Sequence, residues 1–216
     1  MKKIFYLFGA LIIIWLVFII VGFFSNKKEN LSEIPNTKYQ IQNTLILFYN
    51  KDLISAAPAN WQEFMDIKNA AMGTADNVEY APEILVLLML QQGVVWPDFD
   101  NELGQLATKF YTQFADSSKK VYTWNEKREN SLIEFSQGRI NMVFAFENDK
   151  EKFSNINYGI SRIPVIDISQ EAPQLPELSE SEKAVLAEMI ESVASGRKSV
   201  EEAIKIGAEQ IKDLND

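Results

Sequence analysis

The sequence predicts a helix-rich α/β domain preceded by one N-terminal transmembrane helix. Residues 4–24 form an apolar run without a charged side chain, about the length that spans a bilayer as a helix. After residue 43, short runs of strand-forming residues alternate with longer segments in which apolar residues recur at helical spacing. Such a mixture is typical of an α/β domain with one core.

The composition excludes several classes of function. The 216 residues include no Cys and no His, which excludes a disulfide framework, a thiolate nucleophile, a serine–histidine triad and a His-ligated zinc site. The formal net charge of −9 argues against a nucleic-acid partner, because phosphates require a basic face. The glycines are too widely spaced for a phosphate-binding loop. We therefore expect no enzyme, no cofactor and no metal.

The N-terminal run predicts a single-pass anchor in the cell membrane, formed by residues 1–28. Lysines flank the run on both sides, so the charge rule orients it weakly. The acidic remainder favours a domain on the extracellular or periplasmic side. A cleaved signal peptide is the alternative, but its apolar stretch is usually about 7–15 residues long and ends at small residues. Residues 21–25, with the sequence VGFFS, lack such a site.

The first elements follow a polar stalk, residues 29–43. Residues 44–49 are strand formers closed by a polar turn. Asn60 is expected to cap the next helix, with Glu63 as its reciprocal partner. A second helix contains the apolar run 84–90 and stops at Gly93, and an apolar run of this kind predicts burial on most sides.

The following segments alternate between helix and strand. Residues 101–115 form an amphipathic helix whose apolar stripe is expected to face the core; the stripe contains Leu103, Leu106, Ala107, Phe110 and Phe114. Residues 131–137 predict a short helix, and residues 140–146 and 158–165 predict strands.

The C-terminal part is expected to be a helical pair. Prolines mark a linker at residues 169–178. Residues 179–216 then predict two helices, each beginning with the Ser-x-x-Glu pattern of a capping box. We expect this pair to pack on the preceding domain.

Seven segments, in order, resemble the extracellular solute-binding proteins of ABC sugar transporters. They cover residues 44–165, and the final helix is also similar to the C-terminal segment of that family. The segments are LFYNKDL at 47–53, PANWQEF at 58–64, GTA at 73–75, LLMLQQG at 87–93, FYTQFA at 110–115, FSQGRINM at 135–142 and YGISRIP at 158–164.

The resemblance implies a single lobe of a type II periplasmic-binding-protein-like fold. Residues 44–168 look like the C-terminal lobe of the family. The segment that holds most of the N-terminal lobe is represented only by the stalk, and the crossing segment expected after Pro164 is missing. Half of a two-lobed clamp loses the enclosure that buries a small ligand.

The resemblance also implies a ligand-binding loop at residues 74–80 and a second contact at the end of the strand 140–146. These positions hold Thr74, Asn77, Tyr80, Phe146 and Glu147. Amide and carboxylate groups can exchange hydrogen bonds with sugar hydroxyls, and aromatic rings can stack on sugars. Trp124, in the loop 122–125, is a further candidate on the same chemical ground. The alternative for each residue is an ordinary place in a loop, a strand end or the core.

The expected function is therefore a membrane-anchored extracellular solute-binding component of an ABC transporter. Its expected partners are a carbohydrate-like solute, an ABC permease or another membrane protein, and the membrane through residues 4–24. The alternative is a non-transport protein-interaction module. In this case another protein binds the face of the lobe that lines the ligand cleft in two-lobed family members.

Overall fold

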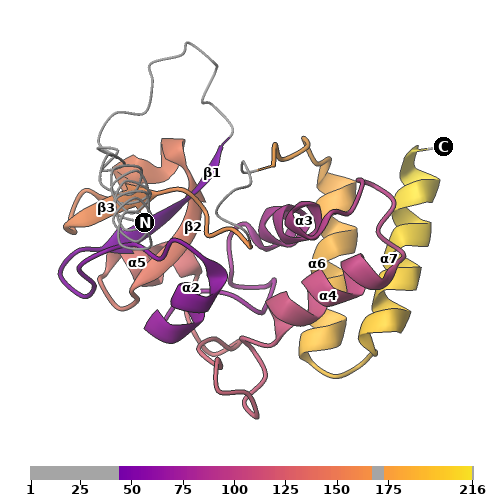
Figure 1. The fold of residues 1–216 in the computed structure, drawn as a ribbon, viewed down its shortest axis with the longest axis horizontal. Helices are drawn as coiled ribbons and strands as arrows, with labels where there is room; N and C mark the ends of the chain where they lie inside the picture. The colour runs from indigo at the N-terminus through magenta and orange to yellow at the C-terminus, as the bar shows by residue number, and fades with distance from the viewer. Residues whose placement is uncertain (1–43, 167–172, 216) are drawn as a thin grey trace, which may run out of the picture. The chain divides into compact units, whose positions relative to one another are not determined.

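The computed structural model describes residues 44–166 and 173–215 (Figure 1). The described residues form one compact unit. The predicted membrane span 4–24 and the stalk 29–43 lie outside the described residues. Within the described residues, no helix is both long and apolar enough to cross a bilayer.

A three-stranded antiparallel sheet forms one part of the domain. Its strands are β1 (Leu45–Asn50), β2 (Met142–Phe146) and β3 (Tyr158–Ser161), in the order β2-β1-β3. Because β1 and β2 are antiparallel, the start of β1 lies beside the end of β2, with Leu45 opposite Phe146. The central strand is largely buried.

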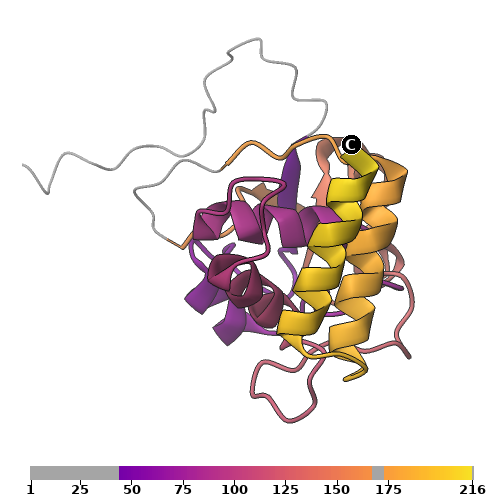
Figure 2. The same cartoon turned by 90° about the vertical axis from the view of Figure 1, so that its right-hand side faces the viewer.

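The helices account for most of the regular structure. Figure 1 shows the sheet with α5 on one side of the domain and α3, α4, α6 and α7 on the other. Both views show α6 and α7 side by side (Figures 1 and 2). The helix-rich α/β prediction is confirmed. The helices are α2 (Trp61–Ile67), α3 (Ala81–Gln92), α4 (Glu102–Thr112), α5 (Ser131–Ser136), a 3-10 helix (Glu147–Phe153), α6 (Glu180–Ala194) and α7 (Val200–Asn215).

Local signals place the helix ends where the sequence predicts them. The Asn60 side chain accepts a hydrogen bond from the Glu63 backbone N–H at 2.9 Å and caps α2. Ser179 and Glu182 form a complete capping box at the start of α6. Gly93 ends α3 with a φ of 95°, a conformation that glycine adopts without a steric penalty.

The buried face of α4 differs from the expected one. Leu103 and Leu106 are 38% and 46% exposed. Ala107 and Phe114 of the predicted stripe are buried, but Gly104, Thr108 and Tyr111 complete the inner face in place of the two leucines. A Cβ atom at Gly104 would clash with the backbone oxygen of Phe99. The chain just before the helix therefore packs directly on Gly104. Thr108 can be buried beside it because its hydroxyl donates to the Gly104 carbonyl at 2.9 Å.

The core contains a cluster of aromatic rings between α2, β2 and the residues just after α4. The ring centroid of Trp61 lies 5.3 Å from that of Phe64 and 5.9 Å from that of Phe144. Phe64 also contacts Phe114 in an edge-to-face arrangement at 5.9 Å. Such pairs stabilise a core beyond the area that they bury. They fix β2, at whose end the candidate site lies.

Strand β3 is shorter than predicted. It ends at Ser161 rather than near residue 165. Val165 instead forms an isolated parallel bridge with Asn60. The segment after β3 thus leaves the sheet and runs beside the start of α2.

Candidate functional site

The six predicted ligand-contact residues fall into two groups. We call Thr74, Asn77 and Trp124 the Asn77 cluster, since all three are buried around the Asn77 side chain. We call Tyr80, Phe146, Glu147 and the neighbouring Asp149 the Tyr80 cluster. The three predicted members of the Tyr80 cluster are partly exposed.

Every hydrogen-bonding group of the Asn77 amide has a protein partner. Its Oδ1 atom accepts from Thr74 Oγ1 at 2.6 Å and from Trp124 Nε1 at 2.7 Å. Its Nδ2 atom donates to the backbone oxygens of Asn125 and Arg128, both at 2.9 Å. Two accepted and two donated bonds are the full capacity of a side-chain amide. The amide therefore has none left for a solute hydroxyl.

Trp124 is fully buried rather than exposed in its loop. The guanidinium of Arg128 lies 4.7 Å from the centroid of its ring, a cation–π distance. In this structure Thr74, Asn77 and Trp124 hold the loops 74–77 and 124–128 together and offer little surface to a solute. The ligand contacts predicted for these three residues find no support in their geometry.

The loop that carries Thr74 and Asn77 is also held from two helices. The Oε1 atom of Glu191, on α6, accepts from the backbone N–H groups of Ala75 and Asp76 at 2.5 and 3.0 Å. The hydroxyl of Tyr111, on α4, donates to the Thr74 backbone oxygen at 2.9 Å. Burial raises the pKa of Tyr111 well above its usual range, so its hydroxyl stays protonated and remains a donor.

The Tyr80 cluster brings together the start of α3 and the end of β2. The rings of Tyr80 and Phe146 meet edge to face, with centroids 4.7 Å apart. The Tyr80 hydroxyl donates to Asp149 Oδ2 at 2.8 Å, and the Phe146 backbone N–H donates to the same oxygen at 3.1 Å. Lys152 Nζ lies 2.7 Å from Asp149 Oδ1. Asp149 thus fixes both aromatic residues.

The electrostatics of the Tyr80 cluster keep the tyrosine neutral. Burial, together with the hydrogen bond to Asp149, raises the pKa of Tyr80 well above its usual range. The Glu147 side chain is 36% exposed, and its carboxylate lies 3.9 Å from Lys150 Nζ. The cluster therefore presents aromatic carbon beside a solvent-accessible hydrogen-bond acceptor. Such a surface can bind a neutral ring that carries hydroxyl groups.

Sequence reasoning missed two residues that position these clusters. Asp149 lies three residues after Phe146, a spacing at which an acidic side chain can accept from the start of a helical turn. Glu191 lies more than a hundred residues from its loop, and no local signal points to that contact. In the described part of the chain, no group of three or more acidic residues could hold a metal ion.

Comparisons with known proteins show the family of the chain. A family model described as bacterial extracellular solute-binding protein matches residues 37–178, whereas a search of curated proteins found no match. The matched range covers more than half of the chain and includes every residue of both clusters. The chain therefore belongs to the family of bacterial extracellular solute-binding proteins.

Proposed function

We propose that the protein binds a carbohydrate solute outside the cell as the membrane-anchored component of an ABC transporter. Family membership supports solute binding and an extracellular location. The observation that carries the carbohydrate proposal is the Tyr80 cluster, in which two aromatic rings lie beside carboxylates at the end of β2.

The chemistry of the Tyr80 cluster suits a neutral, hydroxylated solute. The C–H face of a sugar packs on aromatic carbon, as Tyr80 and Phe146 could provide. Its hydroxyls donate to carboxylate oxygens such as that of Glu147.

The membrane and transporter parts of the proposal rest on the sequence. The uncharged run 4–24 would anchor the domain, and an ABC permease would receive the solute from it. A domain held at the membrane stays at high local concentration near such a partner.

A thermal melt tests the carbohydrate proposal. The full-length chain in lipid nanodiscs would be melted alone and with a panel of mono- and oligosaccharides. A ligand that binds only the folded state raises the midpoint, so we expect one sugar class to do so. Phe146→Ala should abolish the shift, whereas Ile160→Ala, on the edge strand β3, should retain it. The absence of a shift with every sugar would contradict a carbohydrate solute, and a shift that survives Phe146→Ala would contradict the site.

A second candidate function is a protein-interaction module that associates with a second copy of the chain. Val95, Leu103 and Leu106 are 73%, 38% and 46% exposed, and α3 ends beside Leu103. Contiguous exposed apolar side chains are typical of interaction sites. Sedimentation of the full-length chain tests this function: self-association that Leu106→Glu removes would support it, and a monomer at all concentrations would contradict it.

A further inference from the structure

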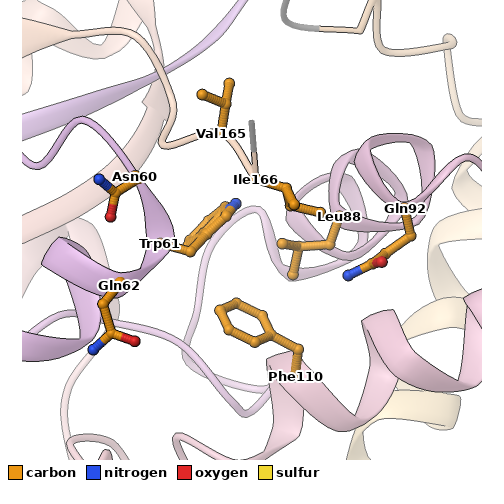
Figure 3. A pocket seen from close by; sticks show the side chains of 8 residues that line it. All are labelled: Asn60, Trp61, Gln62, Leu88, Gln92, Phe110, Val165 and Ile166. Atoms are coloured by element: carbon orange, nitrogen blue, oxygen red, sulfur yellow. The ribbon is translucent and has the colours of Figure 1, made fainter. Parts of the chain in front are cut away.

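A cavity of about 640 Å³ lies outside both clusters (Figure 3). It is bounded by the start of α2, the middle and end of α3, Phe110 of α4 and the segment after β3. It shares no residue with the Asn77 or Tyr80 cluster. Its lining consists of Asn60, Trp61, Gln62, Leu88, Gln92, Phe110, Val165 and Ile166.

The lining contains no charged side chain. Five of its residues are apolar and three are amides, although 24% of the whole chain is Asp, Glu, Lys or Arg. A charged ligand would lose hydration without gaining a partner, which is unfavourable. The cavity therefore selects for an uncharged ligand.

One wall of the cavity is a fixed aromatic ring. Trp61 is buried, and its Nε1 donates to Gln91 Oε1 at 2.7 Å. Gln91 in turn donates to the Pro164 backbone oxygen at 3.0 Å. The Phe110 ring meets Trp61 edge to face, with centroids 5.3 Å apart. Since these rings are held in place, little ordering is needed when a flat apolar group binds against them.

Gln92 supplies a polar group for a ligand. No hydrogen bond joins its side chain to another residue in the ranges 44–166 and 173–215, whereas Gln62 donates to Asp66 at 3.2 Å. Figure 3 shows the Gln92 amide directed toward the space between Leu88 and Phe110. A side-chain amide both donates and accepts, so it can pair with a hydroxyl or an amide on the ligand.

We propose that this cavity is a second binding site, for an uncharged small molecule with an apolar ring and one hydroxyl or amide group. Its volume lies within the roughly 300–1,000 Å³ that is usual for small-molecule sites. The site is separate from the Tyr80 cluster, so the inference does not depend on the carbohydrate proposal.

Benzamide and its charged analogues test the proposal directly. The full-length chain would be labelled with 5-fluorotryptophan in lipid nanodiscs, and its ¹⁹F NMR spectrum would be followed during titration. The Trp61 signal is assigned by its loss in Trp61→Phe. We expect benzamide to shift this signal saturably, and benzoate and benzamidine to bind at least about tenfold more weakly, because neither charge finds a partner. Equal affinity for the three compounds would overturn the proposal.

Matched variants locate the binding. Ile166 and Ile160 are 49% and 47% exposed, but only Ile166 lines the cavity. Ile166→Trp should abolish the benzamide shift by filling the space, and Ile160→Trp should leave it unchanged. The ¹⁹F signals of the other tryptophans report whether each variant is folded. A shift that persists in folded Ile166→Trp, or that never saturates, would refute the site.

A second pair of variants tests the polar contact. Gln92→Leu should weaken benzamide binding by about tenfold, which is the size of one lost hydrogen bond. Gln105→Leu, at a partly exposed position on α4, should have no effect. Unchanged benzamide affinity in Gln92→Leu would overturn the proposed role of the amide. Sugar binding at the Tyr80 cluster, measured separately by the thermal melt, is expected to be the same in all these variants.

Discussion

Asn77 and Tyr80 lie only three residues apart, yet their clusters serve different purposes. The polar atoms of Asn77 are all used by the protein itself. Tyr80 uses its hydroxyl in the same way, but its ring and that of Phe146 keep some exposure. The Asn77 amide thus stabilises the loop itself, whereas the Tyr80 ring remains partly accessible at the surface.

This difference shows why residue type alone does not identify a ligand contact. Tryptophan and asparagine are as suitable for binding sugars as tyrosine and phenylalanine. What separates the two clusters is the supply of buried partners: Trp124 finds an acceptor in Asn77 and a cation in Arg128. Burial with satisfied partners stabilises the fold and removes the side chain from solvent.

The largest expected effect is a difference in the free energy of unfolding between variants of the two clusters. Trp124→Ala should lower the free energy of unfolding by about 3–5 kcal/mol, because it leaves a large cavity. Phe146→Ala should cost less than half as much, since its ring is partly exposed. Urea denaturation of the full-length chain would measure both. Equal losses would contradict the distinction between a buried and an exposed cluster.

The contact between Glu191 and the loop should have the next largest effect. Glu191→Gln replaces a charged acceptor of two backbone N–H groups, and we expect a loss of about 1–2 kcal/mol. Hydrogen exchange at Ala75 and Asp76 should also become faster. Glu188→Gln is the matched control on the same helix, because its ion pair with Arg197 is exposed and should contribute little. Unchanged exchange in Glu191→Gln would refute the loop contact.

Tyr80 variants distinguish the ring from the hydroxyl. Tyr80→Phe removes the bond to Asp149 and should cost about 1 kcal/mol of stability. Asp149 retains Phe146 and Lys152 as partners, so the rings should stay in place and sugar affinity should change little. Tyr80→Ala should abolish sugar binding, because it removes the ring. If Tyr80→Phe alone abolished binding in the thermal melt, the hydroxyl rather than the ring would be the ligand contact.

The smallest expected effect appears at acid pH. Burial of the Glu134 carboxyl opposes its ionisation, but Arg128 and Arg139 outweigh it and hold the pKa of Glu134 below its usual value of 4.5. A lowered folded-state pKa stabilises the protein above pH 4.5, and that contribution is lost as the pH falls through the folded-state pKa. Stability should therefore fall more steeply below pH 4.5 in the wild type than in Glu134→Gln. Parallel pH profiles would contradict this assignment.

The elements that the sequence predicts well are those with local signals. Asn60, Gly93 and the pair Ser179–Glu182 act on backbone groups within a few residues, so their patterns can be read directly from the chain. The buried face of α4 could not be read this way. Leu103 and Leu106 satisfy helical periodicity, but the helix instead buries the face with Gly104, which packs against the backbone at Phe99.

The candidate site was predictable only in part, because its contacts are between distant residues. The ordered motifs correctly indicated a solute-binding family. The structure brings Tyr80 and Phe146 into contact, and their role as ligand contacts stays a prediction. The burial of Trp124 depends on Asn77, 47 residues earlier. A single sequence does not show such pairs, so an exposed loop and a buried one look alike.

The Glu191 contact also gives α6 a thermodynamic link to the loop before Tyr80. Because α6 accepts two hydrogen bonds from that loop, a protein that bound α6 and moved Glu191 would change the order of the loop. By reciprocity, a solute that ordered the loop would change the affinity of α6 for that protein by the same factor. Coupling of this kind would let the domain report its occupancy to a protein bound at α6.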